Sequence, residues 1–365
     1  MHCACGGLYA GDGMERSVIT SVHNERVKRW AELLTRKGRE RQRKFLLEGV
    51  HLVEEALKTG ANVEAVLYSR EKGIPAELAR YAAGAVSAAD SASGSESDRP
   101  SHANGSLRRD MQPHVNGRAS WLNKPFQAND STRLGKPLQA NDSSRPGRRS
   151  HADRSPGSDY VSAAATCAAP SVEWIAVSEA VLERCSDAQT PQGVIAVAGK
   201  PPAEAASFLL AEPGALVVAV DGVQDPGNLG AIIRSADAAG ATGVVLGRGT
   251  VDLYNPKTLR ATMGSLFHLP VVEGDLPQLL PQLMPDRAQI IAASPYGEES
   301  CYDVDFTRPT WLVVGSEGAG ISPAVGALAR NVRIPMPGRA ESLNVAMAAT
   351  VLLFEAVRQR CFSQK

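Results

Sequence analysis

The segment that most constrains the fold covers residues 331–360, because it joins an extended run to a long helical pattern through a tight turn. Val332 and Ile334 precede this turn at residues 335–338, which contains two prolines and a glycine. A strand, a tight loop and a helix N-terminus direct backbone N–H groups toward one point, which suits a ligand-binding loop. An ordinary strand–loop–helix connection of an α/β protein is the alternative interpretation. The helical part predicts one buried face, because apolar and small residues recur at i, i+3, i+4 and i+7. These residues are Leu343, Ala346, Met347, Thr350, Val351, Phe354 and Val357.

The distribution of charge bears on the partner of this chain, although the total charge does not. The 365 residues allow two domains of ordinary size, and 39 Lys and Arg balance 39 Asp and Glu. Residues 26–44 hold nine basic residues against two acids, and residues 99–154 hold eleven against four. These segments permit a polyanionic partner for the N-terminal half, and a solvated basic face is the alternative.

Cysteine usage and hydropathy indicate a reduced, cytoplasmic protein. The six cysteines are scattered, and only Cys3 and Cys5 are neighbours, with no second pair at zinc-ligand spacing. We therefore expect no metal site. No apolar run approaches the ~18–20 residues of a membrane span. The N-terminus also lacks the charged-then-apolar layout of a signal peptide.

Alternating strand and helix patterns predict a small α/β domain at residues 15–200. Residues 1–14 show little pattern and are interpreted as a loose extension, so Met1 and Met14 are both open as the translation start. Residues 84–170 interrupt the domain with a polar segment that repeats Lys-Pro-x-Gln-Ala-Asn-Asp-Ser from Lys124 and from Lys136. Such a composition buries too little apolar surface to offset chain entropy, so we expect disorder. The insertion is either simply tolerated or a source of loose affinity for nucleic acid.

A second α/β domain is predicted at residues 213–365, after a linker at residues 201–212. The unbroken β-branched run at residues 216–220 is typical of a buried strand, and further strands are expected at residues 244–246, 290–293 and 311–314. Helical patterns separate these strands. The alternation predicts an open, mostly parallel sheet, in which ligands bind at the carboxyl ends of the strands.

Common catalytic motifs are absent, and three loops remain as the candidate site. The sequence contains no GxxxxGK[ST], HExxH or GxSxG. His268 is interpreted as a satisfied, semi-buried residue. The three loops each follow a predicted strand of the second domain, at residues 221–234, 315–322 and 335–344. Their residue types suit hydrogen bonding and close backbone approach, and do not suit metal binding or covalent catalysis.

The three loops together resemble a known enzyme family. DGVQDPGNLGAIIRSADAAG, VVGSEGAGIS and IPMPGRAESLNVAMAATVLLFEAVRQR are similar to the three motifs of the SpoU (TrmH-type) RNA ribose 2′-O-methyltransferases of the SPOUT superfamily. They occur in the family's order and cover about residues 215–360. Residues 21–57 resemble, more weakly, the family's RNA-binding domain, whereas the first thirteen residues and the insertion depart from the pattern.

The resemblance implies an α/β fold with a C-terminal parallel SPOUT sheet that contains a deep trefoil knot, plus a small ribosomal-protein-like RNA-binding domain. It implies methyl transfer from S-adenosylmethionine to a ribose 2′-hydroxyl of ribosomal RNA, with 23S guanosine favoured, by a homodimer. A transfer-RNA 2′-O-methyltransferase and a non-catalytic RNA-binding or ribosome-assembly factor are the alternatives. A nucleotide-dependent dehydrogenase is disfavoured, because the glycines at residues 315–320 follow the order G-x-x-G-x-G.

Site residues follow from the resemblance by matching positions. The implied catalytic set is Asn228, Arg234, Glu317, Ser342 and Asn344, and the implied cofactor-binding set is Gly315, Glu317, Ile334, Met336 and Leu343. The family proposal makes Arg234 the base. Because a guanidinium has a pKa above ~12 and only donates, a clamp on an RNA phosphate or on developing alkoxide charge is the alternative. Asn228, Ser342 and Asn344 also suit helix caps or turns.

Overall fold

The computed structural model describes residues 18–83, 172–201, 214–283 and 288–362, all of which belong to one compact unit. The predicted extension at residues 1–14, the predicted disorder at 84–170 and most of the predicted linker at 201–212 lie outside the described residues. Within the described part of the chain, no helix has both the length and the apolar composition that crossing a membrane requires.

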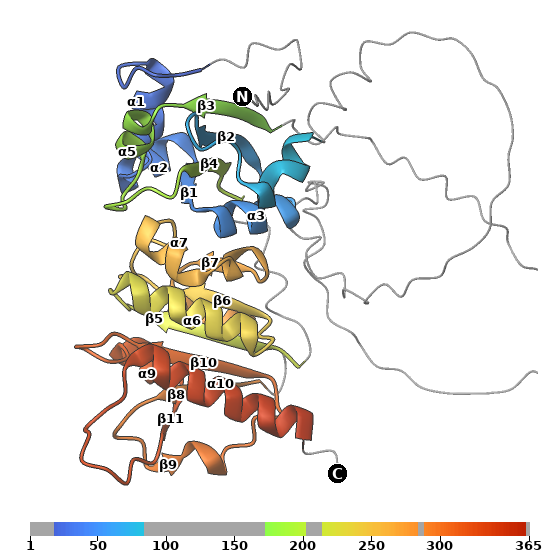
Figure 1. Cartoon of the computed structure of the whole chain (residues 1–365). Coiled ribbons are helices and arrows are strands. Elements are labelled where there is room, and N and C mark those ends of the chain that lie inside the picture. The colour runs from blue at the N-terminus through green and yellow to red at the C-terminus, as the bar shows by residue number, and fades with distance from the viewer. Residues whose placement is uncertain (1–17, 84–171, 202–213, 284–287, 363–365) are drawn as a thin grey trace, which may run out of the picture. The chain divides into compact units, whose positions relative to one another are not determined.

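The first sheet has four strands in the order β1-β4-β2-β3 (Figure 1). Its strands are β1 (Lys44–Glu48), β2 (Val63–Ser69), β3 (Glu173–Val177) and β4 (Val194–Gly199). β4 pairs antiparallel with both β1 and β2, and β2 pairs parallel with β3. The accompanying helices are α1 (Glu25–Glu32), α2 (Arg36–Gln42), α3 (Val50–Lys58) and α5 (Glu179–Cys185). α1 begins where the Asn24 side chain accepts the backbone N–H of Arg26, and α2 where Thr35 accepts that of Gly38.

The second sheet has seven strands in the order β7-β6-β5-β10-β8-β11-β9, and every neighbouring pair is parallel. Its strands are β5 (Leu216–Asp221), β6 (Gly243–Leu246), β7 (Val271–Glu273), β8 (Gln289–Ala293), β9 (Glu299–Ser300), β10 (Thr310–Gly315) and β11 (Arg330–Arg333). The predicted open parallel sheet is therefore confirmed. The helices that alternate with these strands are α6 (Pro226–Ala238), α7 (Pro256–Thr262), α8 (Leu276–Leu283), α9 (Pro323–Gly326) and α10 (Val345–Phe362).

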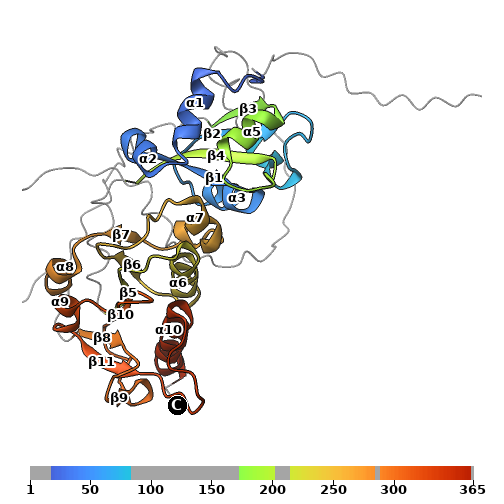
Figure 2. The same cartoon turned by 90° about the vertical axis from the view of Figure 1, so that its left-hand side faces the viewer.

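Helices cover both faces of the second sheet (Figure 2). α6 and α10 contact each other on one face, and α8 and α9 contact each other on the opposite face. Residues along β5 alternate accordingly, because Val218 and Val220 belong to one core cluster, and Val217 and Ala219 belong to the other. Burial on both faces explains the unbroken apolar run of this strand.

The face that α10 buries differs from the predicted one. Core residues of the helix are Ala346, Ala349, Leu352, Leu353 and Ala356. Of the predicted face, Met347 and Phe354 are instead 62% and 48% exposed, and Leu343, just before the helix, is 41% exposed. A hydrogen bond of 2.7 Å between the hydroxyls of Ser235 and Thr350 helps to fix how α10 lies against α6. Because apolar residues occupy more than one side of α10, their spacing alone does not select the buried side.

A buried ion pair connects α2 with the loop that follows β6. The Arg39 side chain is 4% exposed and that of Asp252 is 9% exposed. Arg39 donates from Nε and Nη2 to Asp252 Oδ2, at 3.0 and 2.5 Å. Its Nη1 donates to the carbonyl groups of Leu33 and Leu34. These bonds use four of the five N–H groups of the guanidinium where it is shielded from water.

His268 lies between two carboxylates. Its Nδ1 is 2.8 Å from Asp237 Oδ2, and its Nε2 is 3.1 Å from Glu55 Oε2. Burial of the ring favours a lower pKa for His268, but hydrogen bonds to Asp237 and Glu55 outweigh it, so the pKa is raised. The prediction that His268 has its hydrogen-bond partners within the chain is confirmed, whereas the predicted partial burial is wrong, because its side chain is 37% exposed.

Candidate active site

β5 and β10 are neighbours in the second sheet, and each is followed by one of the predicted loops. Asp221 at the end of β5 pairs in register with Gly315 at the end of β10. From β5 the sheet continues to β6 and β7 on one side, and β10 is followed on the other side by β8 and β11. Ligands of open α/β sheets bind where the strand order reverses in this way.

Loop two, residues 315–322, is held in a compact turn. Ser316 and Gly320 exchange two backbone hydrogen bonds of 2.9 and 3.0 Å, and Gly320 has a φ of +68°. A Cβ atom on Gly315 would lie 2.3 Å from the carbonyl carbon of Gly320, so only glycine fits there. Asp221 Oδ2 accepts the backbone N–H of Ser322 at 2.7 Å, which fastens this loop to the end of β5.

A chain of side-chain hydrogen bonds links the three predicted loops. Asn344 Nδ2 donates to Asn228 Oδ1 at 2.9 Å, and Asn228 Nδ2 donates to Glu317 Oε1 at 2.7 Å. Asn344 Oδ1 also accepts the backbone N–H of Ala346, so this residue caps α10 as well. The structure therefore brings together three of the five residues predicted to be catalytic.

Glu317 is held in its charged form. Its partial burial favours a higher pKa, but a hydrogen bond from the Asn228 side chain and bonds from nearby backbone N–H groups outweigh it. The net result is a lowered pKa. A carboxylate of this kind is a weak base, and its geometry suits it to orienting the amide of Asn228.

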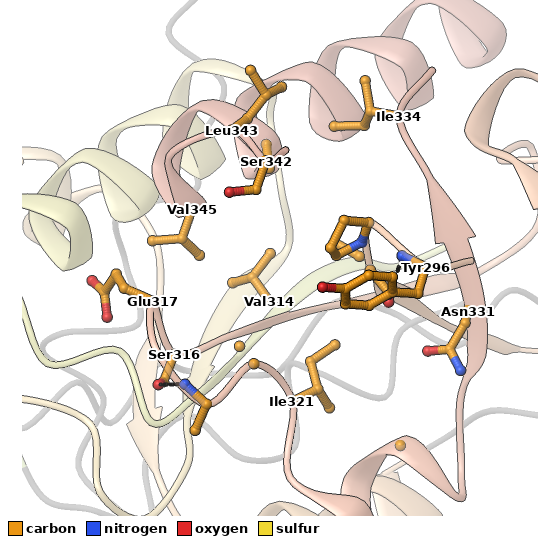
Figure 3. Close-up of a pocket in the computed structure, with 18 of the residues that line it drawn as sticks. Tyr296, Val314, Ser316, Glu317, Ile321, Asn331, Ile334, Ser342, Leu343 and Val345 are labelled. Carbon is orange, nitrogen blue, oxygen red and sulfur yellow. Dashed lines mark hydrogen bonds between the residues drawn. The ribbon is translucent and has the colours of Figure 1, made fainter. Parts of the chain in front are cut away.

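A cavity of about 830 Å³ lies between the ends of β8, β10 and β11 and the start of α10. All five residues predicted to bind the cofactor line it, namely Gly315, Glu317, Ile334, Met336 and Leu343. Ser342 and Asn344 line it as well. Figure 3 shows Glu317 and Ser316 on one side of this cavity, and Tyr296, Asn331 and Ile334 on the opposite side.

The chain matches two family models. That of the SpoU rRNA Methylase family covers residues 215–354, and that of the MRM3-like substrate binding domain covers residues 24–101. A Synechocystis protein named as the uncharacterized tRNA/rRNA methyltransferase slr1673 is 38% identical over 200 residues, which are 53% of this chain and 70% of that protein. The chain belongs to the SpoU methylase family.

Similarity to SpoU proteins extends over nearly the whole chain. The 23S rRNA (guanosine(2553)-2′-O)-methyltransferase RlmP of Bacillus subtilis is 29% identical over 337 residues, which are 92% of this chain and 97% of that protein. The crystal structure of the SpoU methyltransferase AviRb from Streptomyces viridochromogenes, in complex with AdoMet, matches with a TM-score of 0.64 at 26% identity. That match covers 93% of this chain and 99% of AviRb.

The cavity fits the methyl donor of SpoU enzymes, S-adenosylmethionine. Its volume lies within the range of small-molecule sites, roughly 300–1,000 Å³. Apolar side chains such as Val314, Ile321 and Ile334 alternate in its lining with a few polar groups, as is usual for cofactor sites. The trefoil knot expected of a SpoU sheet stays a prediction.

Two residues predicted to be catalytic lie outside the hydrogen-bond chain. Ser342 is exposed in loop three, and Arg234 is exposed on α6. Within the described ranges, Arg234 forms no hydrogen bond or ion pair, so its guanidinium is available to a molecule outside the chain. The sequence reasoning also missed the lining residues after β8, Ser294, Pro295 and Tyr296. Their signal was a Pro-Tyr-Gly turn that directly follows a buried strand.

Proposed function

We propose that this SpoU-family protein transfers the methyl group of S-adenosylmethionine to a ribose 2′-hydroxyl of ribosomal RNA, with a 23S guanosine as the favoured target. The observation that carries the proposal is the meeting of three loops, which combine a cofactor-sized cavity with the chain of Asn344, Asn228 and Glu317. The name of the Bacillus subtilis relative supports ribosomal RNA and guanosine.

Gly315, Ile334, Met336 and Leu343 would hold the cofactor in the cavity that they line. Bound S-adenosylmethionine supplies a methyl group already activated on a sulfonium. The task left to the protein is to align the ribose hydroxyl for in-line attack and to assist the loss of its proton.

Asn228 is the residue best placed to position the ribose. Glu317 uses one N–H of its amide and Asn344 uses one lone pair of its oxygen, which leaves a second N–H and a second lone pair. Because both partners fix the plane of the amide, these free groups point in a defined direction. Asn228 would thus bind a ribose hydroxyl without moving.

Arg234 would act on the RNA through its charge. A guanidinium keeps its proton at any physiological pH, so a clamp on a phosphate or on the developing alkoxide is chemically easier than general-base catalysis. Its exposure and its lack of a partner within the described residues support this role. We expect Arg234→Ala to abolish methyl transfer while S-adenosylhomocysteine still binds, and full activity of that variant would contradict both the clamp and the base.

RNA would also contact the basic surface of α1 and α2. A hollow of about 540 Å³ there is lined by four basic and two acidic residues together with Gln42. Lys28 pairs with Glu25, and Arg41 pairs with Glu32, whereas Arg29 has no ion pair among the described residues. Arg29 is therefore the first residue to replace in RNA-binding measurements, because a phosphate contact should weaken binding to all sequences about equally.

We also propose a homodimer formed through α10. Leu343, Met347 and Phe354 are exposed although they are large and apolar, and family active sites are expected at a dimer interface. Burying this face against a second copy removes it from water. Light scattering of Met347→Arg tests the proposal, since the variant should be a monomer and a dimeric variant would contradict it.

Methylation mapping tests the function as a whole. Purified protein, S-adenosylmethionine and RNA from a strain without this gene should yield one new 2′-O-methyl group in 23S rRNA. Methylation of transfer RNA alone would favour the alternative substrate, which the name of the Synechocystis relative also includes. A protein that binds the cofactor and RNA but methylates neither 23S rRNA nor transfer RNA would be an assembly factor. With ribosomal RNA as substrate, we place the enzyme in the cytoplasm.

A further inference from the structure

The loop after β8 is fastened tightly to β11. Ser294 donates its backbone N–H to the carbonyl of Val332 at 2.9 Å, and Arg333 Nη1 donates to the carbonyl of Gly297 at 3.0 Å. A Cβ atom on Gly297 would lie 2.6 Å from the carbonyl carbon of Val332, so the backbones pack without room for a side chain. These contacts hold the loop rigidly at Ser294 and at Gly297, and Tyr296 lies between these two residues.

Tyr296 has a fixed backbone, but its side chain is exposed and its hydroxyl lacks a hydrogen-bond partner among the described residues. Its backbone N–H donates to Ser294 Oγ at 3.3 Å, but its hydroxyl forms no hydrogen bond among the described residues. The residue is 92% exposed and nevertheless lines the cavity of the active site. A single exposed tyrosine is ordinary, whereas one held rigidly at the rim of a cofactor cavity offers a flat apolar face to a ligand.

The chemistry of the cavity indicates which part of the cofactor lies beside this ring. The charged side chains among its lining residues are Glu317 and Glu341, which belong to loops two and three. Figure 3 shows Glu317 on the side opposite to Tyr296. The lining residues that the ends of β8 and β11 contribute, such as Pro295 and Ile334, carry no charge. A charged amino-acid group is poorly satisfied there, but a purine ring is well accommodated.

We propose that Tyr296 is an aromatic wall of the cofactor site and stacks on the adenine base of the bound methyl donor. The assignment rests on the proposed function, and it concerns a residue outside the three loops that carry the family resemblance. Stacking between a base and an aromatic ring depends on contact between their π-faces and needs no hydrogen bond from the tyrosine hydroxyl.

Isothermal titration calorimetry on the RNA-free, full-length protein tests this assignment with two ligands. S-Adenosylhomocysteine contains adenosine and the amino-acid group, whereas 5′-methylthioadenosine contains the same adenosine without the amino-acid group. Tyr296→Ala should raise Kd for both ligands by the same factor, about 5- to 30-fold, which is the lower part of the range for a stacked base. Tyr296→Phe keeps the ring and should stay within about twofold of the wild type. Tyr302→Ala is the matched control, because Tyr302 is 55% exposed and lies outside the cavity.

Each remaining outcome overturns the assignment in a different way. A raised Kd for S-adenosylhomocysteine with an unchanged Kd for 5′-methylthioadenosine would place the ring at the amino-acid end. Unchanged Kd values for both ligands would remove Tyr296 from the cofactor site, and a simultaneous loss of turnover would assign the ring to the RNA. These results leave the proposed function intact. A wild-type protein that binds neither ligand would overturn the proposed function, and the stacking with it. Thermal melting of Tyr296→Ala should match the wild type, because the exposed ring supports no core.

Discussion

Replacing Gly315 by alanine tests whether the compact turn of loop two sets the shape of the cofactor cavity. The new Cβ atom would lie 2.3 Å from the carbonyl carbon of Gly320 and 2.4 Å from the backbone nitrogen of Ile321. Real Cβ contacts are essentially never shorter than 3.0 Å, so the backbone of Gly320 must move by roughly 0.7 Å. No flexible side chain can absorb the shift, because the atoms that clash are backbone atoms.

The size of the effect follows from the strain of inserting one methyl group into a packed site, about 1–3 kcal/mol. Strain that remains in the ligand-free protein lowers its Tm. If the loop moves to relieve the strain, cofactor binding must return it to the strained conformation. The free energy of that return raises Kd about 5- to 150-fold. Scanning calorimetry and titration with S-adenosylhomocysteine measure the two parts separately.

Gly338→Ala is the matched control, because a Cβ atom at Gly338 meets nothing within 4 Å and Gly338 does not line the cavity. We expect its Tm and Kd to equal those of the wild type. If Gly315→Ala also shows wild-type Tm and Kd, the close approach of residues 315 and 320 does not shape the cavity, and the reasoning is refuted.

Three further predictions concern the network, the buried ion pair and pH. Asn228→Ala should lower kcat about 10²- to 10³-fold with little change in Kd for S-adenosylhomocysteine, since the proposed role of Asn228 is to orient the ribose and this residue does not line the cavity. Wild-type turnover would contradict this role. Asp252→Asn leaves Arg39 buried without its charge partner and should reduce the free energy of unfolding by about 3–5 kcal/mol in urea. Glu32→Gln, which breaks an exposed pair, should reduce it by less than about 1 kcal/mol, and equal losses would refute the distinction. Because the folded-state pKa of His268 is raised, its stabilising contribution is complete below about pH 6.5 and is lost as the pH rises through the folded pKa. His268→Gln should therefore flatten the pH dependence of the urea midpoint above about pH 6, and an unchanged profile would argue against this role.

Much of the fold and the position of the site could be predicted from the sequence, because both depend on local patterns. The unbroken apolar run of β5 requires burial on both faces, and parallel strands place the loops that follow them at one edge. Similarity to the family motifs predicted that Asn228, Glu317 and Asn344 share one site, and the structure links them by hydrogen bonds. The roles of these residues remain proposals.

Other features depend on packing that spacing does not reveal. Residues such as Met347 and Leu353 occupy different sides of α10, and both sides are apolar, so only contact with α6 and the sheet decides which side is buried. Tyr296 was missed because its signal, a short Pro-Tyr-Gly turn after a strand, is not periodic and is common in α/β proteins. Its place at the rim of the cavity depends on the fit of the Gly297 backbone against β11.

The order of strands in the second sheet has a consequence for biosynthesis. β5 pairs with β6 on one side and with β10 on the other, so the strand that begins at Leu216 is flanked on both sides only after Thr310 has been translated. Asn344, which completes the hydrogen-bond chain with Asn228, emerges later still. A nascent chain still attached to the ribosome therefore presents its basic α1 and α2 to RNA well before it can modify any nucleotide, and the capacity for chemistry arises only as the final helix docks.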